Sequence, residues 1–190
     1  MKRSVLSAMW IGLAMAAGGP ACADDAATRR YELPNLDTLE LVLPAGWQDE
    51  VDTPPGGVTL TIRIFPQAGE AFEVFVTPEF PEPTAPEVRD AATLRAAVRE
   101  AAARVQPDAV EGQLEIRRLQ GESGIGFYYA ATDRAPEPGE FRIMNQGALQ
   151  AGALTLWFTV LTNDGQDAVV ADALAMLQAA VHLETGADRR

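Results

Sequence analysis

The chain has very few of the side chains that bind transition metals or form disulfides. Its 190 residues include one cysteine, Cys22, and one histidine, His182. A structural zinc site needs about four ligands, mostly cysteine and histidine, and an internal disulfide needs a second cysteine. The sequence also has no glycine-rich phosphate loop before a helix and no acidic loop with calcium-binding spacing. We therefore predict no metal and no cofactor.

Serine is scarce as well, which limits nucleophilic chemistry. Ser123 is the only serine after residue 7, so a serine–histidine–acid triad would have to combine it with His182. The stretch Gly121 to Ile125 departs from the G-x-S-x-G pattern at its last position, and it precedes a predicted strand instead of following one. His182 is predicted in the last turn of a helix, where a cation complements the helix dipole. The triad is not favoured, whereas a carboxylate pair acting on a glycoside stays open.

Basic side chains are fewer than acidic ones, with 15 lysines and arginines against 27 aspartates and glutamates. The formal net charge is -12, and it becomes more negative if Lys2 and Arg3 are removed with a leader. Nucleic acids and anionic membrane surfaces both favour net positive partners. We therefore predict no nucleic-acid partner. Three arginines at helical spacing, Arg95, Arg99 and Arg104, suggest a solvated helix face, with a basic patch for an acidic partner as the alternative.

The first residues have the pattern of a cleaved secretory signal. Lys2 and Arg3 precede a short apolar run, and 21–23 reads Ala-Cys-Ala, an A-x-A cleavage site. The run is shorter than the ~20 residues that span a bilayer, so no stable membrane span is expected. We predict a periplasmic or secreted protein after cleavage near Ala23. Lipidation of Cys22 is the alternative, but Gly19, Pro20 and Ala21 lack the aliphatic residue expected before a lipidated cysteine.

One domain is expected at 36–183, after a flexible lead-in at 24–35 and before a frayed tail at 184–190. Alternating apolar residues and turn signals predict seven strands. They are Leu36–Leu43, Val58–Phe65, Glu70–Thr77, Gln113–Leu119, Gly124–Thr132, Phe141–Leu149 and Leu154–Thr162. One helix is expected after the proline-rich segment 78–86, with a capping box at Thr84 and Glu87, and another runs from about Asp167 to His182.

The predicted strand Leu154–Thr162 is apolar on both faces and so needs cover on both sides. The fold class is therefore α+β, with two amphipathic helices on opposite faces of a mostly antiparallel sheet of about six or seven strands. In the strand before Thr132, Tyr129 and its alternate neighbours face one way and Tyr128 the other. Trp47, after a Pro-Ala-Gly turn, is expected to fold over the edge of the core.

Several short motifs support a family resemblance. A Leu-Pro-x-Gly-Trp-like signature at 43–47, Gly-x-Gly-x-Tyr-Tyr at 124–129, Thr132-Asp133 and Asn-Gln-Gly at 145–147 occur in that order. Together with the order of elements, they resemble the superfamily of photosystem II PsbP-like and Ran-binding Mog-type proteins, in particular its small secreted bacterial members. The resemblance implies a three-layer α/β/α sandwich and mostly non-enzymatic roles in binding or assembly.

The expected function is a non-catalytic binding or assembly module, with an envelope protein as partner and the oligomeric state left open. The alternative is an enzyme or small-ligand binder that uses a cleft near Trp47, Tyr128, Asp133 and Asn145. That alternative rests on polar and aromatic groups beside glycines at strand ends, where clefts form.

Overall fold

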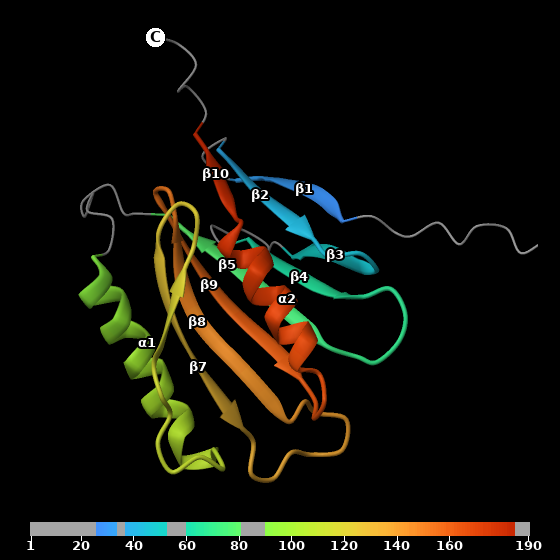
Figure 1. Cartoon of the computed structure of the whole chain (residues 1–190), viewed down its shortest axis with the longest axis vertical. Helices are drawn as coiled ribbons and strands as arrows, with labels where there is room; N and C mark the ends of the chain where they lie inside the picture. Colours follow the sequence, from blue (N-terminus) through green and yellow to red (C-terminus); the bar gives the residue numbers. More distant parts are fainter. Residues whose placement is uncertain (1–25, 34–36, 53–59, 81–89, 185–190) are drawn as a thin grey trace, which may run out of the picture.

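The computed structural model describes residues 26–33, 37–52, 60–80 and 90–184, and these ranges form two sheets and two α-helices (Figure 1). Five strands come first, namely β1 Ala27–Glu32, β2 Thr38–Leu43, β3 Trp47–Asp52, β4 Thr61–Pro66 and β5 Glu73–Glu79. Helix α1 Ala91–Val105 and the short 3-10 turn η1 Gln106–Asp108 follow. The remaining elements are β6 Arg117–Gln120, β7 Ile125–Thr132, β8 Ile143–Ala151, β9 Leu154–Thr162, α2 Asp167–Gln178 and β10 Val181–Leu183.

The larger sheet has seven antiparallel strands in the order β3-β4-β5-β9-β8-β7-β6. Strands β4 and β5 form the predicted hairpin, and β8 and β9 form a second one in which Ala151 lies opposite Leu154. Gly152 turns the chain between them at φ 60°, a left-handed conformation that glycine adopts without strain. The expectation of a mostly antiparallel sheet with two main helices is therefore confirmed.

The smaller sheet, in the order β1-β2-β10, was not predicted. The segment expected to be a flexible lead-in contains β1, which pairs with β2 along its whole length, so that part of the prediction is wrong. Two side chains of β1 also reach the first strand of the larger sheet. Arg29 lies 3.0 Å from an Asp49 oxygen, and the Tyr31 hydroxyl donates to the other Asp49 oxygen at 3.1 Å. Burial and the nearby carboxylate both raise the pKa of Tyr31.

The two helices pack against different hydrophobic clusters, and alternate residues of β7 belong to each. Tyr129 and its alternate neighbours lie in the cluster that contains Leu94 and Val98 of α1. Tyr128 packs instead against the cluster that contains Met176 and Leu177 of α2. The predicted alternation along β7 is therefore confirmed. In Figure 1, α1 lies beside β7 and α2 crosses in front of the sheet.

The helix starts differ from the sequence predictions. Asp90 caps α1, since its Oδ1 accepts a hydrogen bond from the Thr93 backbone N–H at 2.7 Å. The predicted capping box at Thr84 and Glu87 lies outside the described residues. The turn before α2 contains Asn163 and Asp164, both good capping residues, but the N-cap of α2 is Gln166, whose side chain makes no capping bond. The proline-rich loop was also placed too early, because 78 and 79 belong to β5.

His182 was predicted to end α2, and this is wrong. The helix ends at Gln178, and His182 lies in β10, opposite Leu39 of β2. Its side chain is 2% exposed, and its Nε2 lies 3.0 Å from Asp37 Oδ2. The imidazole is thus part of the packing that holds the C-terminal strand to the smaller sheet. None of the helices within the described ranges is long and apolar enough to cross a membrane.

We predict that His182→Ala lowers the free energy of unfolding by about 2–3 kcal/mol, because it removes a buried side chain and the hydrogen bond that the part-buried Asp37 carboxylate makes to it. Urea unfolding followed by circular dichroism measures the change. Leu183→Ala is the matched control, since Leu183 belongs to the same strand but is exposed. Equal small losses in both variants would show that the His182–Asp37 contact does not anchor β10.

Candidate functional site

The four residues predicted for a common cleft lie in three places. Trp47 packs against Phe72, with ring centroids 4.5 Å apart, and lines a groove beside the start of α2. Asp133 lines a pocket at the end of β7. Tyr128 and Asn145 line one cavity between α2 and the sheet. The structure therefore brings together two of the four residues and separates the other two from them.

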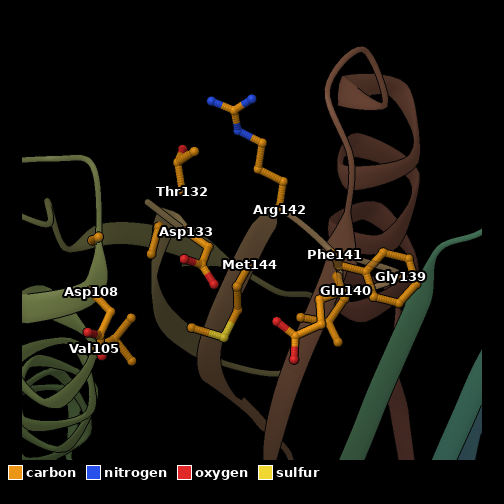
Figure 2. Close-up of a pocket in the computed structure, with 12 residues that line it drawn as sticks. Val105, Asp108, Thr132, Asp133, Gly139, Glu140, Phe141, Arg142 and Met144 are labelled. Carbon is orange, nitrogen blue, oxygen red and sulfur yellow. The ribbon is translucent and has the colours of Figure 1, made fainter. Parts of the chain in front are cut away.

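The pocket that contains Asp133, which we call the Asp133 pocket, has a volume of about 450 Å³ and an apolar floor (Figure 2). Figure 2 shows the Asp133 carboxylate pointing toward Met144, with Asp108 on one side and Glu140 on the other. Arg142 points away from Met144 in the same view, and its guanidinium lies 3.1 Å from Asp164. No described residues of this pocket or elsewhere gather three or more histidine, cysteine or acidic side chains as a metal site would require.

The Asp133 carboxylate has a structural role in the loop that leaves β7. Its Oδ1 accepts a hydrogen bond from the Ala135 backbone N–H at 2.8 Å, which tightens the turn. The Asp133 N–H donates to the Arg142 carbonyl at 2.8 Å and closes the loop. An isolated bridge to Ala109 ties this residue to the segment that follows α1. Asp133 is thus used mainly to shape the end of β7.

Glu111 holds the end of β7 from outside the sheet. Its carboxylate accepts hydrogen bonds from the Thr132 backbone N–H at 3.0 Å and from the Thr132 hydroxyl at 2.8 Å. Burial raises the pKa of Glu111, but the two hydrogen bonds from Thr132 favour the ionised form and outweigh it, so the pKa lies below its ordinary value. Folding therefore favours the ionised carboxylate.

We expect Glu111→Gln to lower the free energy of unfolding by about 1–2 kcal/mol at pH 7. Since the folded-state pKa is below the ordinary 4.5, this contribution is present above about pH 4.5 and is lost as the pH falls through the folded value. Urea unfolding at pH 7 and pH 3 should show a variant effect that is large at pH 7 and small at pH 3. Glu122→Gln, an exposed control, should show little effect at either pH. An effect of Glu111→Gln that does not change with pH would contradict this assignment.

The second cavity, which we call the α2 cavity, has a volume of about 280 Å³ and lies between α2 and the sheet. Three neighbouring strands each contribute one neutral polar residue to its lining: Tyr128 on β7, Asn145 on β8 and Thr162 on β9. The other polar lining residues lie on β6, in the turn before α2 and at the start of α2: Arg117, Asn163, Gln166 and Asp167. Its apolar wall includes Val170 and Leu174 of α2. The register places these strands side by side, since Ala130 lies opposite Asn145 and Asn145 opposite Val160.

One of these polar side chains, Thr162, has a buried hydroxyl without a hydrogen-bond partner within the described residues. Asn145 is 4% exposed, and its amide makes no hydrogen bond to the part of the chain that the structure describes. Thr162 is 1% exposed, and its hydroxyl also lacks a partner within that part. More than nine in ten buried polar groups in proteins are paired, so each exception needs an explanation. The Thr162 hydroxyl is such an exception, and it shares the lining of the α2 cavity with Asn145.

The other face of the same strands shows the usual situation. The Tyr129 hydroxyl donates to Gln146 Oε1, and Gln146 Nε2 donates to Thr159 Oγ1 at 3.2 Å. Burial raises the pKa of Tyr129 to about 12, so its hydroxyl stays protonated and remains a donor. The buried polar side chains Tyr129, Gln146 and Thr159 on the α1 face are therefore satisfied by one another, whereas the Thr162 hydroxyl in the α2 cavity is not.

Gly147 completes the Asn-Gln-Gly motif by making room for Tyr128, which lies opposite it on β7. A Cβ at Gly147 would clash with the Phe127 carbonyl oxygen and would lie 2.6 Å from the Tyr128 Cβ. The three residues of the motif therefore act differently. Asn145 lines the α2 cavity, Gln146 pairs on the opposite face, and Gly147 permits close approach of β7.

Gly147→Ala should lower the free energy of unfolding by about 1–3 kcal/mol, because β7 must shift to relieve the clash. Gly112→Ala is the matched control, since a Cβ there meets no atom within 4 Å. Thermal unfolding of both variants checks the difference. A melting temperature for Gly147→Ala equal to that of Gly112→Ala would mean that the strands have space to spare at this position.

Ser123 and His182, the only candidates for a serine triad, are not hydrogen-bonded to each other within the described residues. Ser123 is exposed in the turn before β7, and the His182 imidazole contacts Asp37 instead. Sequence reasoning did not single out Thr162 or the wall of α2, because nothing in the sequence distinguishes a paired threonine from an unpaired one. Comparisons with protein-family models, with curated proteins and with solved structures found no match for this chain.

Proposed function

We propose that this chain is a non-catalytic binding module that holds a small ligand in the α2 cavity. The observation that carries the proposal is Thr162, whose hydroxyl is buried at the cavity wall with no hydrogen-bond partner in the described part of the chain. Burying a polar group without a partner costs about 1–3 kcal/mol by mutational comparison. A ligand with a hydrogen-bonding group would pair with Thr162 and with the neighbouring Asn145 amide and remove that cost when it binds.

The chemical character of the lining supports binding over catalysis. Tyr128, Asn145 and Thr162 are neutral hydrogen-bonding groups, and none of them has a neighbouring base in the lining arranged as a catalytic pair. The apolar side chains of Val170 and Leu174 give the ligand a surface to pack against. A mixture of apolar and convergent polar groups is typical of small-molecule sites.

The wider proposal is that the protein acts in the periplasm or outside the cell, as a member of the PsbP-like and Mog-type superfamily with a three-layer α/β/α arrangement. Packing of α1 and α2 against separate clusters supports three layers. The charged first residues and the A-x-A sequence at 21–23 support export. An envelope protein remains the proposed source or receiver of the ligand, as expected for an exported binding module.

The test pairs two threonines of β9 that face opposite sides of the sheet. Thr162→Val should leave stability unchanged or raise it by up to about 1 kcal/mol, because it removes an unpaired buried hydroxyl. Thr159→Val should lower stability by about 1 kcal/mol, because Gln146 loses its acceptor. Urea unfolding measures both changes. Loss of stability in Thr162→Val similar to that in Thr159→Val would show that the Thr162 hydroxyl is needed for folding and is not a feature of the site.

Ligand binding is tested by a thermal-shift screen of small metabolites, sugars and peptides against the full chain. Compounds that raise the melting temperature of the wild type should fail to raise that of Asn145→Leu, while Thr159→Val should respond as the wild type does. A screen in which every active compound acts equally on Asn145→Leu would place binding elsewhere. A flat screen would count against the proposed function itself.

A further inference from the structure

The edge of β7 beside the α2 cavity has an open backbone position at Ala130. Backbone groups of alternate strand residues point to the same edge. Thr132 uses this edge, because its carbonyl accepts from the Val110 N–H at 2.8 Å and its N–H donates to Glu111. Strand β6 begins only at Arg117, opposite Tyr128. Ala130 lies between these two regions, and the described residues provide no hydrogen bond to its backbone at this edge.

The α2 cavity has one cationic and one anionic side chain in its lining. Arg117 lies on the same face as Tyr128, its partner across the ladder, and its only ion pair within the described residues is a loose one of 3.8 Å to the exposed Glu115. Asp167 is the first residue of α2 and has no ion pair in the same part of the chain. Both charges are therefore available to a ligand.

The two charges lie toward opposite ends of the cavity. Arg117 lies opposite Tyr128. Thr162 lies opposite Ile143, which in turn lies opposite Thr132, so Thr162 is at the Thr132 end of the strands. Asp167 follows the turn after Thr162 and therefore lies toward that end. The strand from 128 to 132 spans about 13 Å at about 3.3 Å per residue. The side chains of Arg117 and Asp167 reach into the cavity from its two ends and shorten this distance. A ligand of two extended residues spans at most about 7 Å, which matches the distance that is left between the two charged groups.

We propose, on the basis of the proposed function, that the ligand of the α2 cavity is a dipeptide with free ends and an aliphatic side chain. Its carboxylate binds Arg117 and its ammonium group binds Asp167. Its peptide group pairs with the open backbone of Ala130 and with the amide of Asn145. The aliphatic side chain packs against Val170 and Leu174. Arg117, Asp167, Ala130 and Asn145 then each have a polar partner, and the Thr162 hydroxyl lies beside Asn145 on the same face of the sheet.

Electrostatics favours such a zwitterion over a singly charged ligand. The chain carries a net charge of -12, so a simple anion approaches against the overall field. A simple cation would be repelled by the positive charge of Arg117 inside the cavity. A dipeptide is neutral overall, and its two charges match both ends. The volume of about 280 Å³ is below that of most sites for larger ligands, which begin near ~300 Å³, and so favours two residues over a longer peptide.

Isothermal titration calorimetry on the full chain tests the proposal with five probes: Ala-Leu, Ala-Leu-amide, N-acetyl-Ala-Leu, free leucine and the uncharged N-acetyl-leucinamide. Ala-Leu should bind tightest. A probe that lacks either the free carboxylate or the free ammonium group should bind about tenfold more weakly. The variants Arg117→Gln and Asp167→Asn, which remove the matching protein charges, should weaken the binding of Ala-Leu by a similar factor. Two matched controls should bind as the wild type does. Arg118→Gln alters the next arginine, which points to the other face, and Asp172→Asn alters an exposed aspartate of the same helix.

The outcomes separate the ligand class from the proposed function. Equal binding of Ala-Leu and uncharged N-acetyl-leucinamide, both abolished by Asn145→Leu, would overturn the dipeptide and leave the α2 cavity as the binding site. Tight binding of Ala-Leu that is unchanged by Asn145→Leu, Arg117→Gln and Asp167→Asn would overturn the site. No binding of any probe, while other compounds in the thermal-shift screen act through Asn145, would overturn only the dipeptide. No binding by any compound would overturn both.

Discussion

Burial of β9 on both faces is the constraint on which the rest of the structure depends. Leu156, Phe158 and Val160 lie in the cluster beneath α2, while Trp157 packs against the cluster beneath α1. A strand with two apolar faces is unfavourable where either face meets water. Strand β9 lies between β5 and β8, and both faces of the sheet therefore need a cover here. The separate positions of α1 and α2 follow from this requirement.

The same strand also separates two chemical environments. Thr159 points to the α1 face, where it completes a network with Gln146 and Tyr129, and Thr162 points into the α2 face, where its hydroxyl has no partner among the described residues. The two threonines are three residues apart in one strand, so period-two alternation alone places them on opposite faces. The difference between a hydrogen-bonded threonine on the α1 face and an unpaired one on the α2 face thus arises within a single strand, β9.

The parts of the fold that the sequence predicts are those with strong local patterns. Strand β9 begins and ends where its apolar run does, and the hairpin of β4 and β5 follows from alternation and turn residues. Strand β1 was missed because its residues are mostly polar and exposed, and only pairing with β2 makes it a strand. His182 was misplaced because the helical spacing of Val170, Leu174 and Leu177 continues to Val181, although the backbone leaves the helix at Ala179. Long-range pairing decides both cases.

The candidate site shows the same division. Tyr128 and Asn145 come together because β7 and β8 form a hairpin whose register sets Gly147 against Tyr128, and both residues then face α2. Asp133 was expected beside them because it ends the same strand. Its position one residue beyond Thr132 instead puts its carboxylate into the loop, where it bonds the Ala135 N–H. Proximity in sequence predicts a shared strand, but the face of the sheet and the local hydrogen bonds decide which residues share a cavity.

Unpaired polar groups in a well-paired protein limit what the α2 cavity can be. If the cavity served only to pack α2 against the sheet, apolar side chains at 145 and 162 would fill it at lower free energy, since buried unpaired groups cost stability. A chain that satisfies Gln146 so completely on one face has the means to satisfy its neighbour on the other. Functional sites are where proteins retain groups that are unfavourable for folding alone. The proposed ligand of the α2 cavity would account for the buried Thr162 hydroxyl, because a group that pairs with it removes the cost of leaving it unpaired.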